Sequence, residues 1–104
     1  MAFSDLAQLI QDNGNGVRAF EKAAEEAFAA ASKSPGLAVA YFVLGSEAAD
    51  FSDVYDRMPV TKSISDAAQA RFADHAAKLD AAIESPEQTV TALNEIVADI
   101  LADR

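Results

Sequence analysis

The most regular pattern of apolar and polar positions in the chain runs from residue 37 to residue 58. Apolar side chains recur there at alternating steps of four and three residues: Leu37, Tyr41, Leu44, Ala48, Phe51, Tyr55 and Met58. This spacing places them on one stripe of a helix. A buried β-strand is the alternative, because Val39 and Phe42 favour strands, but the pattern extends beyond the usual length of a strand. We therefore predict a central helix over residues 37–58.

Further helices are predicted from similar spacing and from signals for helix ends. Their expected ranges are 4–13, 17–32, 63–83 and residue 85 onward. Ser4, Ser63 and Ser85 each stand where a side-chain oxygen caps a helix, and Pro86 strengthens the last of these starts. The stripe of the last helix consists of Val90, Leu93, Val97 and Ile100. The two Asn-Gly pairs of residues 13–16 predict a tight turn after the first helix.

Chain length and composition favour a single all-α domain over residues 1–104. Hydrophobic residues make up 51% of the chain, and many of them are alanine, the best helix former. A chain of 104 residues is long enough for one core. The four longer helices are similar in length, and short connections make consecutive helices antiparallel neighbours. The expected fold is an up-and-down four-helix bundle with a short additional N-terminal helix.

The charge of the chain limits the classes of partner. Seventeen acidic residues against eight basic ones give a formal net charge of -9, and no segment is basic. Direct binding to nucleic acid or to an anionic membrane surface is therefore disfavoured. No apolar run approaches the ~20 residues of a membrane-spanning helix. The chain has no cysteine, which excludes disulfides and thiolate metal sites and fits a cytoplasmic protein.

The chain contains little that indicates chemistry. His75, the sole histidine, falls on a predicted apolar stripe between Phe72 and Leu79. We expect a histidine at the edge of the core with one hydrogen-bond partner, whose replacement by alanine would cost about 1 kcal/mol. A catalytic or pH-sensing role is the alternative. No motif for a nucleophile, a phosphate or a metal is present. The sequence therefore predicts a protein that is not an enzyme, with no catalytic residue, metal site or cofactor.

Excess apolar surface marks a candidate interaction site on the central helix. Residues 37–44 are all apolar, so this half is apolar around its whole circumference. Some of these side chains face away from the core and need a cover, either the N-terminal helix or a second copy of the chain. We favour the second copy, in a homodimer. Acidic residues continue this surface, and the full set is Val39, Phe42, Val43, Glu47, Asp50 and Asp53.

These observations lead to one functional hypothesis and two alternatives. The leading hypothesis is a non-enzymatic protein–protein interaction or regulatory module that acts through a helical surface and self-associates. The first alternative is an acidic inhibitor or nucleic-acid mimic that occupies a basic protein site. The second is a helical bundle that binds a small apolar ligand in a cavity lined by aromatic side chains. Candidate lining residues are Tyr41, Phe42, Phe51, Tyr55 and Phe72.

Overall fold

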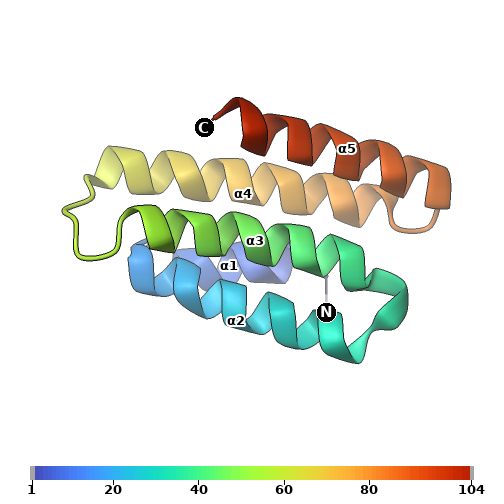
Figure 1. Cartoon of the computed structure of the whole chain (residues 1–104), viewed down its shortest axis with the longest axis horizontal. Helices are drawn as coiled ribbons and strands as arrows, with labels where there is room; N and C mark the ends of the chain where they lie inside the picture. The colour runs from blue at the N-terminus through green and yellow to red at the C-terminus, as the bar shows by residue number, and fades with distance from the viewer. Residues whose placement is uncertain (1, 104) are drawn as a thin grey trace.

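Residues 2–103 of the computed structural model form an all-α bundle, as the sequence predicts (Figure 1). The elements are α1 (Ser4–Asp12), α2 (Val17–Lys33), the short 3-10 helix η1 (Pro35–Leu37), α3 (Ala38–Val54), α4 (Lys62–Ala82) and α5 (Pro86–Ala102). Helices α2 and α3 form one antiparallel pair, and α4 and α5 form another. Helix α1 packs against α2 and α4, while α5 lies at the edge of the bundle against α4 and α3.

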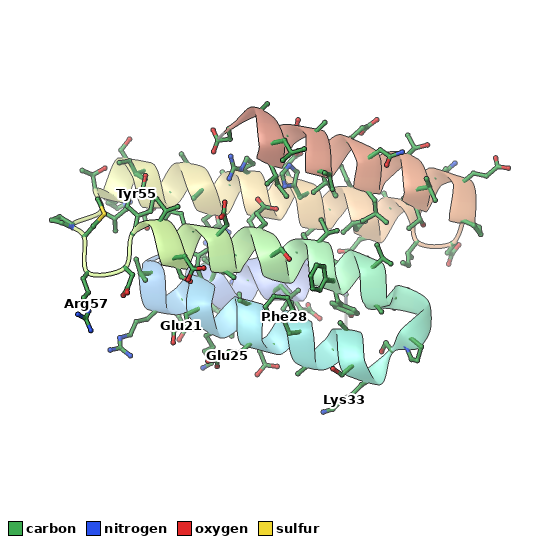
Figure 2. All side chains as sticks on the ribbon, in the orientation of Figure 1. Glu21, Glu25, Phe28, Lys33, Tyr55 and Arg57 are labelled. Carbon is green, nitrogen blue, oxygen red and sulfur yellow. The ribbon has the colours of Figure 1, made fainter. Side chains whose placement is uncertain are left out.

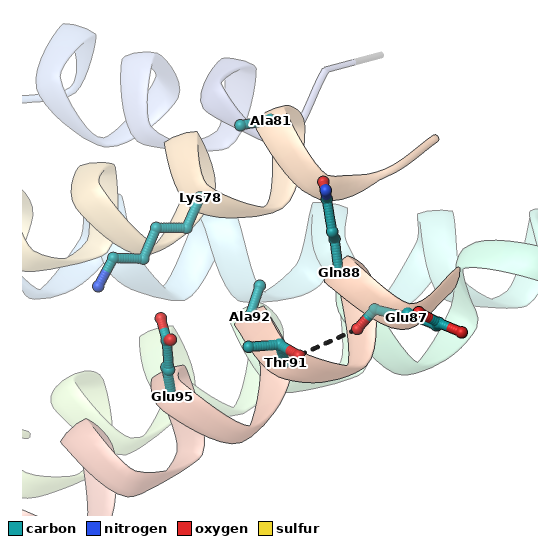
Figure 3. Close-up of a pocket in the computed structure, with 7 residues that line it drawn as sticks. All are labelled: Lys78, Ala81, Glu87, Gln88, Thr91, Ala92 and Glu95. Atoms are coloured by element: carbon teal, nitrogen blue, oxygen red, sulfur yellow. Dashed lines mark hydrogen bonds between the residues drawn. The ribbon is translucent and has the colours of Figure 1, made fainter. Parts of the chain in front are cut away.

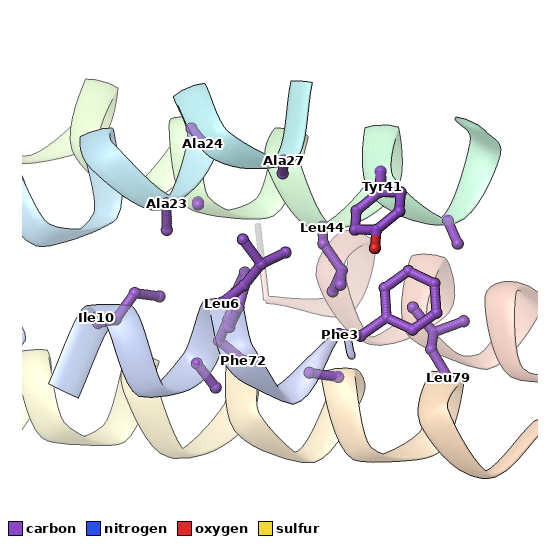
Figure 4. Packing of buried hydrophobic residues seen from close by; sticks show 14 of the residues in the cluster. Phe3, Leu6, Ile10, Ala23, Ala24, Ala27, Tyr41, Leu44, Phe72 and Leu79 are labelled. Atoms are coloured by element: carbon purple, nitrogen blue, oxygen red, sulfur yellow. The ribbon is translucent and has the colours of Figure 1, made fainter. Parts of the chain in front are cut away.

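Helix α1 is an integral part of the core. Leu6 and Ile10 are fully buried, and Figure 4 shows them pointing from α1 toward the alanines of α2. Phe3 precedes the helix and packs against the ring of Tyr41 with centroids 4.8 Å apart. Because α1 is used in this way, it does not cover the outer side of α3. The predicted alternative in which the N-terminal helix shields Val39 and Phe42 is therefore wrong.

The start of α1 is not capped by Ser4, contrary to the prediction from the sequence. Ser4 is already a helical residue, and the cap residue Phe3 makes no side-chain cap bond. The backbone N–H groups of Phe3 and Ser4 instead donate to the carboxylate of Asp80 on α4, at 2.7 and 3.0 Å. A carboxylate at a helix N-terminus satisfies free N–H groups and interacts favourably with the helix dipole. Asp80 thus ties α1 to α4, a tertiary contact that local sequence signals do not reveal.

The central helix is shorter than predicted. Helix α3 ends at Val54, so Tyr55 and Met58 lie outside it and Met58 is exposed. The chain turns at Arg57, whose φ of 59° lies in the left-handed region that stops a helix. The apolar spacing continues past the true end because Tyr55 still packs on Phe51, with ring centroids 4.9 Å apart.

Two other helix starts test the capping predictions. Helix α4 begins at Lys62 with Thr61 as its cap, whose hydroxyl oxygen accepts from the N–H of Ile64 at 3.2 Å. The predicted cap, Ser63, is wrong by two residues, because threonine is also a cap residue and Thr61 comes first along the chain. The Ser85 cap of α5 is confirmed, since its hydroxyl oxygen accepts from the N–H of Gln88 at 3.3 Å.

Small residues allow α2 and α3 to approach closely. Helix α2 buries a face made almost entirely of alanine: Ala19, Ala23, Ala24 and Ala27, with Phe20. On α3 the buried Gly45 lies under the ring of Phe28 from α2. A Cβ atom at residue 45 would lie only 2.7 Å from Cε1 of Phe28, closer than side chains pack. Gly45 therefore provides the space that lets the Phe28 ring lie on α3.

Replacing Gly45 by alanine is expected to lower the free energy of unfolding by about 1 kcal/mol, because displacement of the Phe28 ring outweighs the gain in helix propensity. In a Phe28→Ala background the same change should instead stabilise by about 1 kcal/mol, since only the propensity term remains. Urea denaturation of the four proteins measures both values. Gly36→Ala is the control, because a Cβ there meets nothing within 4 Å. A stabilising Gly45→Ala change in the wild-type background would show that the ring moves at no cost.

Candidate functional site

Charged side chains contact one another where α3, α4 and α5 meet, and two of them, Glu47 and His75, are buried. His75 of α4 is fully buried at the centre of these contacts. Its Nδ1 atom lies 2.7 Å from Oε1 of Glu47 on α3, and its Nε2 atom lies 3.0 Å from Oδ2 of Asp99 on α5. An ionised carboxylate only accepts hydrogen bonds, so both ring nitrogens must donate. This geometry fits a protonated imidazolium held between two carboxylates.

The two carboxylates differ in their exposure to water. Glu47 is 5% exposed, whereas the side chain of Asp99 is 52% exposed. Arg71 extends these contacts, with its Nε atom 3.5 Å from Oε2 of Glu47 and its other end paired with Asp103. The Glu47–Arg71 contact is an ion pair without a well-aligned hydrogen bond, since neither atom has a hydrogen-bond partner. We call these five residues the charged network: Glu47, Arg71, His75, Asp99 and Asp103.

The surroundings of His75 favour its charged form. Burial alone would lower the pKa of His75, but the hydrogen bonds and charges of Glu47, and then of Asp99, outweigh this effect and raise the pKa above 6.5. A raised folded-state pKa means that the proton stabilises the folded protein. This contribution is complete below about pH 6.5, the pKa of an unperturbed histidine, and is lost as the pH rises through the folded-state value.

The network arises from helical spacing on two elements. Arg71 and His75 lie four residues apart on α4, and Asp103, the residue that caps the end of α5, lies four residues after Asp99, so each pair shares a helix face. The two faces meet beside Glu47. The sequence prediction of one partner for His75, at the edge of the core, is wrong because His75 is fully buried and has two partners.

Carboxylates nearer to His75 in sequence are engaged elsewhere. Asp74 is exposed and pairs with Lys78 at 3.4 Å on the same helix. Asp80 accepts from the backbone at the start of α1. A pair of acidic residues four apart at the C-terminal end of α5, matching a basic pair four apart on α4, is the signal in the sequence that would have indicated the network.

The charged network is better suited to holding helices than to chemistry. Both ring nitrogens of His75 are directed at carboxylates, so neither offers a lone pair to a substrate proton or a metal. Within residues 2–103, no three His, Asp or Glu side chains are placed to hold a metal ion together. The geometry instead joins α3, α4 and α5 through one imidazole ring.

The fold exposes some residues of the predicted interaction surface and buries others. Val39 and Phe42 are 65% and 60% exposed on the outer side of α3. Asp53 is exposed, whereas Val43 and Asp50 are half-buried. Glu47 is buried in the charged network, so its placement on an exposed acidic surface is wrong. The sequence pattern did not identify this burial because glutamate is usually solvated on a helix.

The exposed side chains of α3 are extended by one residue of α2. The rings of Phe28 and Phe42 lie 5.7 Å apart between centroids, and Phe28 remains 37% exposed. Figure 2 shows Phe28 on the face of the molecule formed by α2 and α3. We call this surface, formed by Phe28, Val39 and Phe42, the apolar face. Sequence reasoning missed Phe28 because its spacing fits the buried stripe of α2.

A hollow between α4 and α5 offers no comparable site. Its lining residues are Lys78, Ala81, Glu87, Gln88, Thr91, Ala92 and Glu95 (Figure 3). The Thr91 hydroxyl donates to the backbone carbonyl of Glu87 at 3.1 Å, so its proton is already used. Lys78 and Glu95 point toward each other across the hollow. Alanines and solvated charges line a surface groove here, with no activated group.

Comparison with known proteins adds no functional information. No protein-family model, no curated protein and no solved structure matches the chain. None of the helices within residues 2–103 has the length and apolarity needed to cross a membrane.

Proposed function

We propose that the protein is a non-enzymatic interaction module that self-associates through the apolar face. The supporting observation is that Val39 and Phe42 remain mostly exposed although α1 is available as a cover and packs elsewhere. Large apolar side chains contribute about 1.5–3 kcal/mol each when they are fully buried, so leaving these uncovered forfeits stability. An exposed group of aromatic and β-branched residues is typical of a contact surface.

A second copy of the chain is the partner that the charges on α2 favour. Glu21 and Glu25 lie on one side of Phe28 along this helix, and Lys33 lies on the other (Figure 2). The first side also carries Glu26, Arg18 and Lys22, so its net charge is -1 from three acidic and two basic residues. In an antiparallel pair related by a two-fold axis near Phe28, Lys33 of each copy approaches the acidic residues of the other. The apolar face contains no charged residue. Two copies of it can therefore meet without burying a charge.

The size of the apolar face sets the expected strength of the dimer. Phe28, Val39 and Phe42 together leave roughly 300 Å² of apolar surface, since a large aromatic side chain presents about 150–250 Å². A standard interface buries about 800 Å² per partner. The net charge of -9 also makes two copies repel each other. We therefore expect a weak dimer with a Kd on the order of 100 micromolar, weaker than an interface of standard size.

The test is light scattering over a hundredfold range of protein concentration around this Kd. The mass should rise from that of one chain toward twice that value, and Phe42→Glu should weaken association at least 100-fold because it places a charge in the interface. Leu101→Glu is the matched control: Leu101 is 59% exposed on α5, outside the apolar face, and this variant should still dimerise. A wild-type monomer at every concentration, or equal effects of both substitutions, would overturn the proposal.

A further inference from the structure

Helix α5 is the least enclosed helix of the bundle. It lies at the edge against α4 and α3, and only Ala92 and Ile96 among its residues are fully buried apolar groups (Figure 1). Both lie in its first two thirds. Beyond Ile96 the helix is exposed or half-buried, and Val97 and Leu101 are 39% and 59% exposed. In the last two turns of α5 the half-buried Ile100 alone packs against the apolar core, so apolar packing holds this end weakly.

Polar contacts hold that end instead. Asp99 bonds to the buried ring of His75, and Asp103 pairs with Arg71. The covalent connection from α4 enters α5 at its opposite end, near Ser85. The Arg71–Asp103 pair is largely exposed to solvent and contributes little, so release of Asp99 is enough to let residues 97–103 leave the bundle while Ile96 stays docked.

We propose that His75, held between Glu47 and Asp99, is a proton-dependent latch that keeps the C-terminal end of α5 on α3 and α4. With both ring nitrogens protonated, the ring donates to both carboxylates at once. After loss of one proton it can donate to only one of them, and the remaining carboxylate then faces a lone pair. Glu47 is buried and adjoins Arg71, whereas Asp99 is half-exposed and gains hydration on leaving. Asp99 is therefore the partner that is released.

The other charged groups around the ring do not change which carboxylate is released. Arg71 is cationic at every relevant pH and stays near Glu47, which keeps that carboxylate in place. Asp74 and Lys78, on the same helix as His75, pair with each other. Within about one turn of the contact with His75, the charged residues are Glu47 and Asp50 on α3, Arg71, Asp74 and Lys78 on α4, Glu95 and Asp99 on α5, and Asp103 just after α5.

Proton linkage gives the latch a measurable signature. When α5 opens, His75 keeps Glu47 but loses Asp99, so its pKa is lower in the open state than in the closed state. Between these two pKa values the equilibrium constant for opening rises tenfold per pH unit. Below that range the latch is closed and insensitive to pH. Rising pH therefore opens the end of α5, and falling pH closes it.

Amide hydrogen exchange followed by NMR between pH 6 and pH 9 tests the latch. Protection factors, which remove the intrinsic pH dependence of exchange, are compared for residues 97–102 of α5 and residues 23–27 of α2. The protection factors of residues 97–102 should fall at least tenfold between pH 6 and pH 9. Those of residues 23–27 should fall by less. In Asp99→Asn, protection of 97–102 should already be at least tenfold lower at pH 6 and nearly independent of pH, because opening no longer separates a carboxylate from the ring.

Asp74→Asn is the matched control, since Asp74 adjoins His75 in sequence and pairs only with Lys78 among the contacts described. It should retain the wild-type pH dependence. Three results would overturn the latch: protection of 97–102 that does not change with pH, an equal loss of protection in α2, which would indicate global unfolding, or an Asp99→Asn variant that keeps the full pH dependence. Asp99 lies at the surface, so this substitution is not expected to prevent folding.

Discussion

Replacing His75 by alanine is expected to lower the free energy of unfolding by about 3–5 kcal/mol at pH 6, several times the 1 kcal/mol expected from the sequence. The larger value follows from the burial of Glu47, which is 5% exposed. Its carboxylate only accepts hydrogen bonds, so it needs a donor inside the protein. Without the imidazolium, this carboxylate keeps only the imperfectly aligned contact with Arg71 at 3.5 Å. An uncompensated buried charge costs far more than one lost hydrogen bond.

A double substitution separates the cost of the uncompensated Glu47 charge from the cost of lost packing. The variant Glu47→Met/His75→Leu removes both charges and fills their space with apolar side chains. It should be more stable than His75→Ala, and close to wild type, because well-packed apolar residues often replace a buried ion pair without loss. Urea denaturation at pH 6 measures each free energy of unfolding. If His75→Ala lost only about 1 kcal/mol, Glu47 would be neutral or rehydrated, and the imidazolium interpretation would be wrong.

The bundle itself could be predicted because helix periodicity and helix ends are local properties. The stripe of α3, the turn at residues 13–16 and the Ser85 cap each depend on residues a few positions apart. The error at the start of α1 occurred because a distant contact takes over a local role, whereas the errors at the end of α3 and the start of α4 are local. Asp80 of α4 replaces Ser4 at the start of α1, and the left-handed turn at Arg57 ends α3 before the apolar pattern ends.

The candidate sites could be predicted only in part, for the same reason as the start of α1. Exposure of Val39 and Phe42 follows from an excess of apolar residues on one helix, which composition reveals. The charged network requires three helices to meet at His75, and pattern alone cannot say which acidic residue lies at that junction. By its spacing, Glu47 lies beside the apolar stripe of α3, where a side chain is normally solvated. It is buried because α5 packs against α3 and α4 at this point.

The interior of the bundle allows a direct test of the ligand-cavity alternative through Phe72. This residue is fully buried on α4, and its ring meets that of Phe20 edge to face, with centroids 6.4 Å apart. Phe20 in turn stacks on Phe51 at 4.1 Å. The rings therefore fill the space between α2, α3 and α4 by packing on one another. Phe42, also proposed as a lining residue, instead lies on the outer surface, so its assignment to a cavity is wrong.

Phe72→Ala is expected to lower the free energy of unfolding by about 3–5 kcal/mol, because it removes a buried ring and leaves a cavity that the surrounding helices only partly fill. Phe42→Ala, at a mostly exposed phenylalanine, should change stability by less than about 1 kcal/mol at concentrations where the protein is monomeric. Urea denaturation of both variants measures the difference. If the core already contained a ligand cavity, Phe72→Ala would lower the free energy of unfolding only slightly, since the ring would border empty space instead of packed atoms. A loss below about 1 kcal/mol for Phe72→Ala would thus favour a ligand-binding bundle, whereas the full loss would favour a filled core and leave the outer face of α3 as the surface available for binding.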